Sequence, residues 1–391
     1  MLASRGIAIL SALTISLTGI GSDLADALQQ SNVAIKSLLD SITYNDTKEV
    51  TICVAGDNLI HSRILKSGIT ADGYDYTAIY EPIKDVIESY DLAIINQETI
   101  LINDPVQYSG TFPKFGSPTA IGDAVIDAGF DVALHATNHV WDRGEQGVID
   151  SIDFWNEHDI PYVGIHKDKE ESDVQILEVN EIKIALLNVT YGTNGLDVPT
   201  DKKFMVDMLY DTDSLIESLQ YAEDNADITI VFPHWGVEYN HDVTDEQRKL
   251  AQIMADNGAD IIVGTHPHVI EPVERILSDK GKEVLVYWSL GNFLSNQDEV
   301  PRMLGLLANI KIRKDKTGTY FVQQLDIPTV THIESYSNYF EVYPLLDYTE
   351  ELASEHRLRR IKGESFSYDN LLKLYEEVIK PDSIEFEELE D

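Results

Sequence analysis

Short apolar runs alternate with amphipathic segments along the chain from residue 49 to about residue 330. The runs are rich in β-branched residues and are bounded by glycine or polar residues, which is typical of buried strands. They predict strands at 50–55, 92–95, 131–134, 184–189, 228–232, 261–263 and 284–288. Helical periodicity between the runs predicts helices at 120–128, 145–157, 214–225 and 245–257. This alternation predicts an α/β fold in which helices cover the sheets.

Potential metal ligands follow several of the predicted strands directly. They are Asp57, Glu98, Asn138, His234, His266 and His268. In open α/β sheets the ligands bind beyond the carboxyl ends of the strands, so we expect these side chains to share one rim. Carboxylate, amide and imidazole together suit Mn²⁺, Fe²⁺ or Zn²⁺, and the lack of thiolates argues against a structural zinc site. The strand ends therefore predict a metal centre.

The pair His266 and His268 follows the strand predicted at 261–263. Residues two apart in an extended segment point to the same side, so both imidazoles are expected to face one site. Each candidate also has an ordinary interpretation, because an isolated pair of loop histidines is more often exposed than metal-bound. The repetition of ligand types at successive strand ends favours the metal centre. His61, which follows Asp57 on the same predicted rim, is an additional candidate ligand.

His139 is the candidate general acid of this site. It stands beside Asn138, and a histidine holds a proton near neutral pH and releases it to a leaving group. Asp142 is close enough in sequence to orient the ring. The ordinary alternative is that His139 donates a hydrogen bond to a backbone carbonyl.

Six short motifs occur in order between Val50 and Ile312. They are GDNLIH from Gly56, NQE from Asn96, ATNHVWDRG from Ala136, HWGVE from His234, GTHPH from Gly264 and SLGNF from Ser289. Together they resemble the CapA/PgsA-type poly-γ-glutamate capsule biosynthesis proteins, which in turn resemble the calcineurin-like metallophosphoesterase superfamily. The resemblance implies a four-layered α/β/β/α sandwich, two divalent metal ions, and a place at the bacterial cell envelope.

The resemblance also implies a role for each candidate ligand. It gives Asp57 to the first metal and a bridging position to Glu98. It gives Asn138 and His234 to the second metal, divides His266 and His268 between the two, and makes His139 the general acid. The chain departs from the phosphoesterase pattern at Asp57-Asn-Leu59, where that pattern has Asp-x-His, and at Asn96-Gln-Glu98, which replaces Gly-Asp-x-x-Asp. CapA-type proteins share these departures, which weaken the inference of phosphatase activity and leave His61 as a substitute ligand.

Two functions stay open at this point. One is an envelope component that takes part in poly-γ-glutamate synthesis or export, together with a membrane synthase complex. The other is an active, phosphoesterase-like metal-dependent hydrolase that acts on an envelope or extracellular substrate. The expected binding partner in either case is an anionic polymer, poly-γ-glutamate, or a phosphorylated substrate. His139 favours the hydrolase, whereas the departures at the first metal favour the non-catalytic component.

The charge of the chain excludes one class of partner. The sequence has 29 Lys and Arg residues against 68 Asp and Glu residues, which gives a net charge of −39. Such a surface repels nucleic acid and other polyanions, so an anionic substrate needs a local cation to receive it. The single cysteine, Cys53, lies in an apolar run and is expected to be a core residue.

The two ends of the chain differ from the region between them. Residues 1–27 predict a signal peptide or membrane anchor, and 28–48 a linker to the domain at 49–330. The C-terminal extension, 331–391, contains a predicted helix at 368–379 and an acidic tail. A further strand is predicted at 319–327. The basic run RLRRIK at 357–362 is expected to be a salt-bridged helix face rather than a lipid contact.

Overall fold

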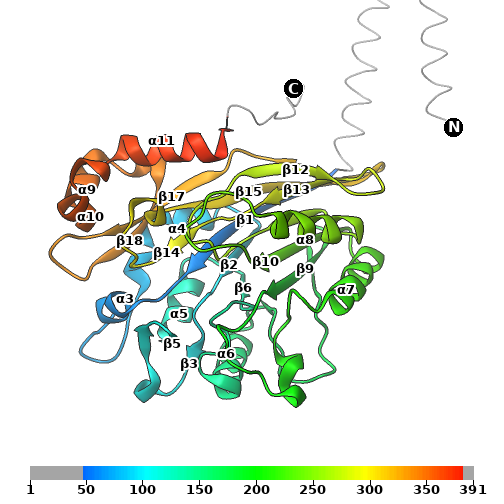
Figure 1. Cartoon of the computed structure of the whole chain (residues 1–391), viewed down its shortest axis with the longest axis horizontal. Helices are drawn as coiled ribbons and strands as arrows, with labels where there is room; N and C mark the ends of the chain where they lie inside the picture. Colours follow the sequence, from blue (N-terminus) through cyan, green and yellow to red (C-terminus); the bar gives the residue numbers. More distant parts are fainter. Residues whose placement is uncertain (1–46, 382–391) are drawn as a thin grey trace, which may run out of the picture. The chain divides into compact units, whose positions relative to one another are not determined.

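The computed structural model describes residues 47–381, and most of these residues build two β-sheets with helices on their outer faces (Figure 1). Lys48–Lys314 and the described residues from Gly318 onward form one compact unit. The predicted signal peptide or anchor, most of the linker and the acidic tail lie outside the described residues. Within residues 47–381, no helix is both long enough and apolar enough to span a membrane.

The first sheet has nine strands in mixed orientation. Its main path runs β18-β17-β15-β1-β2-β6-β7, with β14 paired to β1 and β16 paired to β15. The parallel strands on this path are β1 (Lys48–Asn58), β2 (Leu92–Asn96), β6 (Val132–Leu134) and β7 (Tyr162–Val163). The remaining strands are β14 (Asn292–Leu294), β15 (Leu304–Asp315), β16 (Gly318–Gln323), β17 (Ile327–Ile333) and β18 (Phe340–Pro344).

The second sheet has six strands in the order β12-β13-β11-β10-β9-β8. Its central strands are parallel: β9 (Ile182–Thr190), β10 (Ile228–His234), β11 (Ile261–Val263) and β13 (Glu283–Tyr287). Antiparallel strands close both edges, namely β8 (Gln175–Val179) and β12 (Val273–Leu277). A small third sheet contains β3 (Leu101–Ile102), β4 (Ser109–Thr111) and β5 (Lys114–Pro118).

The strand period of two explains how the layers stack. In β9, Ile184 and Leu186 join the hydrophobic cluster that includes the first sheet, whereas Ala185 and Leu187 join a separate cluster on the other face. That separate cluster includes apolar residues of α7 (Thr212–Asn225) and α8 (Asp245–Asp256).

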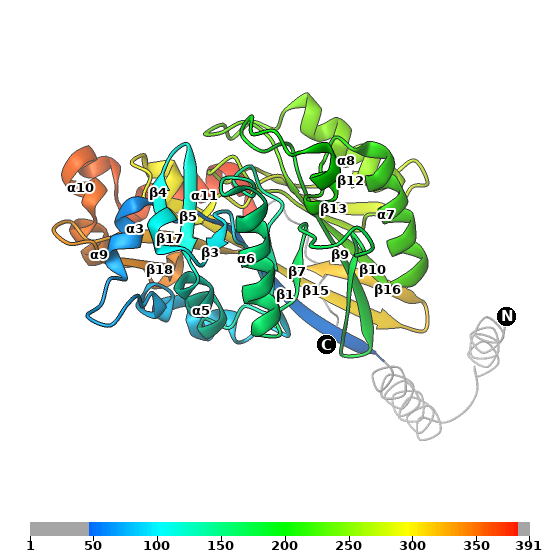
Figure 2. The same ribbon diagram turned by 90° about the horizontal axis from the view of Figure 1, so that it is seen from below.

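On the opposite side, α4 (Glu81–Ile87) and α5 (Ala120–Asp127) pack into the cluster of the first sheet. In Figure 2, α5 and α6 (Gly144–Glu157) lie across the sheets from α7 and α8. The expected four-layered α/β/β/α sandwich is therefore the fold.

The predicted elements can now be compared with the structure. Each strand predicted between residues 50 and 288 and each helix predicted between residues 120 and 257 is present, with ends that shift by a few residues. The helix predicted at 368–379 is α11 (Tyr368–Ile379). The strand predicted at 319–327 is present as β16 but is too long, because regular pairing stops at Gln323 and resumes along the same edge of β15 as β17 from Ile327. The predicted domain end at residue 330 falls inside β17, and the domain boundaries stay a prediction.

The remaining α-helices of the described residues are short and lie toward either end of this region. They are α3 (Ser62–Ser67), α9 (Glu350–Glu355) and α10 (Arg357–Lys362). The basic run predicted to be a salt-bridged helix face is α10. Arg359 pairs with Glu350 at 3.3 Å and Lys362 with Glu299 at 2.7 Å.

Asp326 is a buried carboxyl group in the short break between β16 and β17. Its Oδ1 accepts hydrogen bonds from the Tyr287 hydroxyl and from the backbone N–H of Asn309, both at 2.9 Å. Its Oδ2 has no partner among the described residues. Burial raises the pKa of Asp326 to about 7, although the two hydrogen bonds oppose this shift.

We expect Asp326→Asn to stabilise the protein increasingly as the pH rises. The folded state holds the Asp326 proton more tightly than the unfolded state, so the wild type loses stability from about pH 4 to about pH 7, by about 4 kcal/mol. Asparagine keeps the accepting Oδ1 and does not titrate. The free energy of unfolding is measured in urea at pH 4 and pH 8. Between these two pH values, the stability of the variant relative to the wild type should rise by about this amount. An equal difference at both pH values would contradict the assignment.

Candidate metal centre

The carboxyl ends of strands from both large sheets bring most of the predicted ligands to one place. Asp57 is the next-to-last residue of β1, Glu98 follows β2, and His234 ends β10, while His266 and His268 follow β11. All five side chains are buried, with exposed fractions between 0% and 3%. The rim predicted from the sequence therefore exists as a buried polar cluster between the two sheets.

Asp57 is held by donors on three sides. Its Oδ1 accepts a hydrogen bond from the Asn96 amide at 2.8 Å. Its carboxylate also lies 3.2 Å from the backbone N of His266 and 3.0 Å from Nδ1 of His268. Donors that hold a carboxylate in one orientation are the usual support of a metal ligand.

Glu98 has no such support. It is 1% exposed, and neither of its carboxylate oxygens has a hydrogen-bond partner among the described residues. The nearest cationic groups are Nε2 of His268, at 3.8 Å from Oε1, and Nε2 of His139, at 4.0 Å. Burial, and then the negative charges of Asp57 and Glu238, raise its pKa well above the usual value, although His268 opposes the shift. A buried carboxylate in this state costs several kcal/mol unless a cation accompanies it, so the site fits a metal ion.

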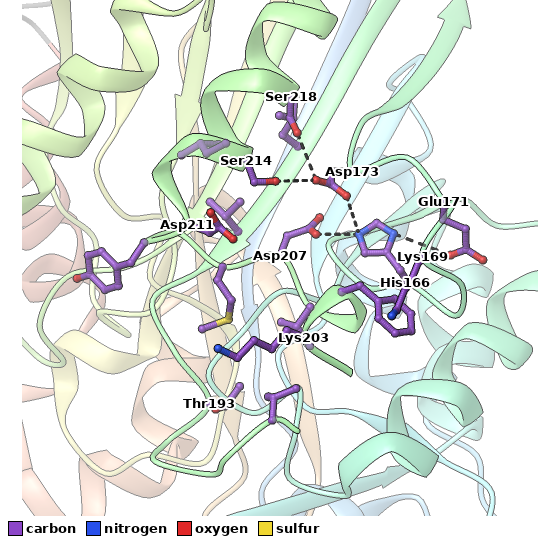
Figure 3. A pocket seen from close by; sticks show the side chains of 18 of the residues that line it. His166, Lys169, Glu171, Asp173, Thr193, Lys203, Asp207, Asp211, Ser214 and Ser218 are labelled. Atoms are coloured by element: carbon purple, nitrogen blue, oxygen red, sulfur yellow. Dashed lines mark hydrogen bonds and ion pairs between the residues drawn. The ribbon is translucent and has the colours of Figure 1, made fainter. Parts of the chain in front are cut away.

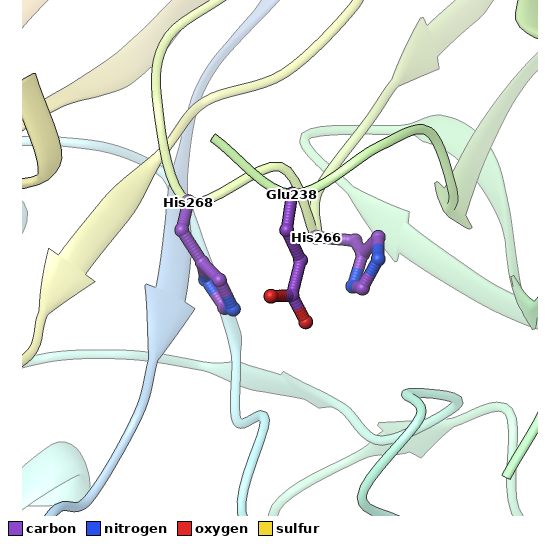
Figure 4. Close-up of side chains that lie close together, drawn as sticks. All are labelled: Glu238, His266 and His268. Carbon is purple, nitrogen blue, oxygen red and sulfur yellow. The ribbon is translucent and has the colours of Figure 1, made fainter. Parts of the chain in front are cut away.

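The donor atoms form two groups that share one histidine. Asp57, Glu98 and His268 make the first group, and Glu238, His266 and His268 make the second (Figure 4). Within each group the donor atoms lie within 4.8 Å of one another. Burial opposes a charge on His268, but Glu98 and Asp57 outweigh it and raise its pKa to about 9, so metal binding would have to displace a proton from this ring. This mixture of imidazole and carboxylate donors fits a divalent transition metal.

Glu238 was missed as a ligand by the sequence analysis. It is exposed and stands in a loop after β10, so no strand end marks it. The available signal was its place at the end of the HWGVE motif, four residues after His234.

His266 and His268 do face one site, as predicted, but the reason given for it, an extended segment, is wrong. The segment is not extended, because His266 has φ 100° and His268 has φ 59°. Non-glycine residues seldom adopt these angles, and such strain is commonly found where a functional loop is held tightly. Gly264 allows the tight path, since a Cβ there would lie 2.1 Å from the Trp288 carbonyl oxygen. The fold around β11 and β13 therefore places the two imidazoles.

Asn138 and His234 lie together but satisfy each other. Oδ1 of Asn138 is 2.9 Å from Nε2 of His234, and Nδ1 of His234 is 2.9 Å from Oγ1 of Thr265. The His234 ring is tilted against that of His266, with ring centroids 4.9 Å apart. Burial and the neighbouring His266 hold the pKa of His234 well below its usual value, so the ring is neutral, as a metal ligand must be.

His139 and Asp142 form the pair expected of a general acid and its orienting group. Nδ1 of His139 lies 2.7 Å from Oδ2 of Asp142, which also accepts a 2.6 Å hydrogen bond from the backbone N–H of Phe115. The Phe115 ring packs edge-on against His139 at 4.6 Å between centroids. The other nitrogen of His139 faces Glu98, so the ring is fixed with one edge toward the donor groups.

His61 lies near the centre but in neither donor group. Its Nδ1 is 3.2 Å from the backbone N of Asn296, and its ring meets Phe115 edge-on at 5.6 Å. Burial lowers its pKa to about 4. The structure thus places His61 beside the site, and its role as a substitute ligand stays a prediction.

A second cluster of histidine and carboxylates lies away from this centre, in a cavity of about 690 Å³ (Figure 3). Nε2 of His166 is 2.8 Å from Asp207, and Asp173 accepts hydrogen bonds from Ser214 and Ser218. Burial opposes a charge on His166, but the hydrogen bond that the ring donates to Asp207, together with the negative charges of Asp207, Asp173 and Glu171, outweighs it and raises the pKa of His166. These groups satisfy one another, in contrast to Glu98, so the cluster is explained as an internal ion pair.

Comparison with known proteins gives curated relatives and similar solved structures. The PGA biosynthesis protein CapA of Bacillus subtilis (strain 168) is 34% identical over 207 residues, which are 52% of this chain and 53% of that protein. The capsule biosynthesis protein CapA of Bacillus anthracis is 29% identical over 294 residues, 73% of this chain and 69% of that protein. The chain thus spans about half of the first relative and about two thirds of the second.

Among solved structures, the NAD nucleotidase (NadN) of Haemophilus influenzae has 15% identity and a TM-score of 0.48, and the match covers 86% of this chain and 61% of that one. A putative 5'-nucleotidase from Staphylococcus aureus has 15% identity and a TM-score of 0.44, covering 76% and 54%. A family model described as bacterial capsule synthesis protein PGA_cap matches residues 51–297. Because that match covers more than half of the sequence, the chain belongs to the bacterial capsule synthesis protein family.

Proposed function

We propose that this protein takes part in the biosynthesis of an anionic capsule polymer at the bacterial cell envelope, after export. We further propose that its centre holds two divalent metal ions and hydrolyses a bond in poly-γ-glutamate or in a phosphorylated substrate. The capsule role is supported by the family and by the names of both relatives. The observation that supports the metal centre most is Glu98, a buried carboxylate with both oxygens unpartnered among the described residues.

The residues divide into two sets of ligands. Asp57, Glu98 and His268 would hold one ion. Glu238 and His266 would hold the other, with Asn138 and His234 beside them. Mn²⁺, Fe²⁺ and Zn²⁺ are the ions that these donors suit. When bound, such ions make a water molecule acidic enough to attack at neutral pH and offset charge on the substrate.

The chain itself supplies orientation and a proton. Asn96 and the backbone of His266 fix the Asp57 carboxylate before any ligand arrives. Asp142 holds Nδ1 of His139, so the proton that leaves is the one on Nε2, which points toward the donor groups. Proton transfer to a leaving group from this position is general acid catalysis.

A non-catalytic envelope component is the second candidate function. Asn138 and His234 satisfy each other, so nothing in their contacts requires a second ion. A single ion held around Glu98 would then stabilise the junction of the two sheets, and the domain would bind the polymer or a membrane synthase complex.

Metal analysis of the purified full-length chain, combined with assays, separates the two candidates. We expect bound Mn, Fe or Zn in the wild type and its loss in His268→Ala, because His268 belongs to both donor groups. His158→Ala is the matched control. The His158 ring is hydrogen-bonded to the Phe154 carbonyl, and His158 belongs to neither donor group. Each protein is assayed on a phosphomonoester, a phosphodiester and poly-γ-glutamate.

If the protein is a metal-dependent hydrolase, turnover should disappear together with the metal in His268→Ala and remain in His158→Ala. Bound metal without turnover on any of the three substrates would favour the envelope component. A wild type that binds no metal would overturn both the ligand assignment and the mechanism built on it.

A further inference from the structure

The arginines of the described chain fall into two kinds. Some pair with a carboxylate, namely Arg248 with Glu274, Arg275 with Glu283, Arg313 with Glu49 and Arg359 with Glu350. Others make no ion pair with any described residue, and three of these lie together: Arg63, Arg357 and Arg360. Unpaired cations in a group are unexpected on a chain with a net charge of −39.

These three residues, which we call the arginine cluster, come from two short helices. Arg63 belongs to α3, and Arg357 and Arg360 belong to α10, and both helices lie at the same end of the sheets in Figures 1 and 2. Partial burial, and then the like charges of Arg357 and Arg360, lower the pKa of Arg63. The charges of Arg357 and Arg360 both act on Arg63, which places the two α10 arginines on the same side as the α3 arginine.

Neutral groups hold the cluster in place. Arg63 donates to the Ser337 carbonyl oxygen at 2.5 Å and to the Asn338 side chain at 3.2 Å. Arg357 donates to Oδ1 of Asn296 at 3.1 Å. The guanidinium of Arg360 lies over the Tyr336 ring, 5.2 Å from its centroid. Contacts of this kind fix the geometry of a guanidinium without neutralising it.

The acidic residues nearby have other partners. Glu299 pairs with Lys362 at 2.7 Å, and Glu350 pairs with Arg359. Glu334 accepts a hydrogen bond from the Ser337 hydroxyl. A hydroxyl contact does not neutralise a carboxylate, but no described carboxylate lies within ion-pair distance of Arg63, Arg357 or Arg360, so the three guanidinium groups can receive an anion from outside the described residues.

The arginine cluster is connected to the metal centre by a chain of contacts. Asn296, which accepts from Arg357, also points its backbone N–H at Nδ1 of His61, at 3.2 Å. The His61 ring meets Phe115, and Phe115 packs on His139. The cluster and the centre are thus joined through three intervening residues, a separation that an extended ligand spans more readily than a small one.

We propose that the arginine cluster is a binding subsite for an extended polycarboxylate chain, and that it holds carboxylates of the polymer beside the metal centre. The choice of polymer rests on the proposed function, whereas the anion subsite rests on the three arginines. A guanidinium binds a carboxylate through two parallel hydrogen bonds, and a polymer offers one carboxylate after another. The acidic surface elsewhere repels the same polymer, which confines it to this subsite.

An anionic membrane fits this cluster less well. Polybasic segments that bind lipid usually carry four to eight exposed cations. Here there are three, and two of them, Arg63 and Arg357, are half-buried and bonded to neighbouring side chains or backbone.

The test compares two pairs of charge-removing substitutions in the full-length chain. Arg357→Gln/Arg360→Gln removes two members of the cluster, and Arg248→Gln/Arg275→Gln removes two arginines that pair with carboxylates elsewhere. Binding of poly-γ-glutamate is measured at low and at physiological salt. We expect the first variant to bind at least tenfold more weakly at low salt, with a flatter salt dependence, and the control to stay within about twofold of the wild type.

Two further measurements keep the outcomes distinct. Equal melting temperatures for both variants establish that the fold is intact, and His268→Ala is expected to keep polymer binding even though it loses metal. Arginine-dependent binding without any hydrolysis would sustain the subsite and refute the proposed catalysis. Equal polymer affinity in both double variants would overturn the subsite. The subsite would also be overturned if the arginines were needed for binding to phosphatidylglycerol vesicles while the protein did not bind the polymer.

Discussion

Glu98→Gln is expected to leave the metal-free protein at least as stable as the wild type and to abolish the stabilisation that added metal provides. In the metal-free wild type the Glu98 carboxylate is buried without a hydrogen-bond donor among the described residues, close to Asp57. Glutamine has the same shape but removes one of the acidic groups that are buried together at this site. The loss of their mutual repulsion should stabilise the metal-free protein by about 1–3 kcal/mol. With metal, the balance reverses, because a neutral amide is a poor substitute for a carboxylate ligand.

The magnitude follows from mass action. A metal ion present at about a thousand times its dissociation constant stabilises the folded state by about 4 kcal/mol. The wild type should therefore melt at a clearly higher temperature in Mn²⁺ or Zn²⁺ than in EDTA, whereas Glu98→Gln should show little difference. Thermal melts at one fixed pH, with and without metal, measure both halves of the prediction.

Glu271→Gln is the matched control for this experiment. Glu271 is also buried, with one unpartnered oxygen within the described chain, and burial raises its pKa to about 8. Its other oxygen accepts from the Gln247 amide at 2.8 Å, and it belongs to neither donor group. Its variant should keep the full response to metal. A Glu98→Gln variant that responds to metal as the wild type does would remove Glu98 from the centre.

The strand ends were predictable because they depend on local pattern. An apolar run that stops at a polar residue marks the end of a buried strand, and Asp57 and His234 both follow this rule. The fold then needs only the parallel order of the strands to bring them together. This is why the polar rim could be expected from the sequence, although its use as a metal site stays a prediction.

What could not be predicted depends on backbone geometry and on distant pairing. Glu238 reaches the site because the chain reverses at Gly236, with φ 92°, and again at Tyr239, with φ 67°. A sequence pattern does not state such angles for a residue like tyrosine. Likewise, β15 pairs with β1 across the length of the domain, as in the register of Ile52 with Ile310, and no local signal encodes that contact.

The departure at Asp57-Asn-Leu59 now has a structural explanation. Asn58 donates to Oε1 of Gln97 at 2.7 Å and accepts from the Tyr80 hydroxyl at 2.9 Å, in a buried network beneath the centre. Leu59 is 3% exposed and belongs to the core. No imidazole from this motif joins Asp57, so His268 carries the imidazole contribution to the first donor group.

His139→Gln should lower turnover by about 10²–10⁴-fold while leaving the bound metal unchanged. His139 belongs to neither of the two donor groups. Its 2.7 Å contact with Asp142 orients the His139 ring and involves no proposed metal ligand. Asp142→Asn keeps the ring but weakens its orientation, so a smaller loss is expected, because asparagine accepts a weaker hydrogen bond from the ring than a carboxylate does. Metal content and turnover, measured on the same preparations, separate these roles from a general loss of structure.

The leaving group decides whether His139 acts as an acid. A proton donor matters most when the departing group is a poor one, so the loss in His139→Gln should be large for an alkyl leaving group. It should shrink by at least tenfold for an aryl leaving group of low pKa, which departs without a proton. The comparison applies to whichever ester or amide the wild type hydrolyses. An equal loss for both leaving groups would mean that His139 positions the substrate and does not donate the proton, and the role of the His139 and Asp142 pair would have to be reassigned.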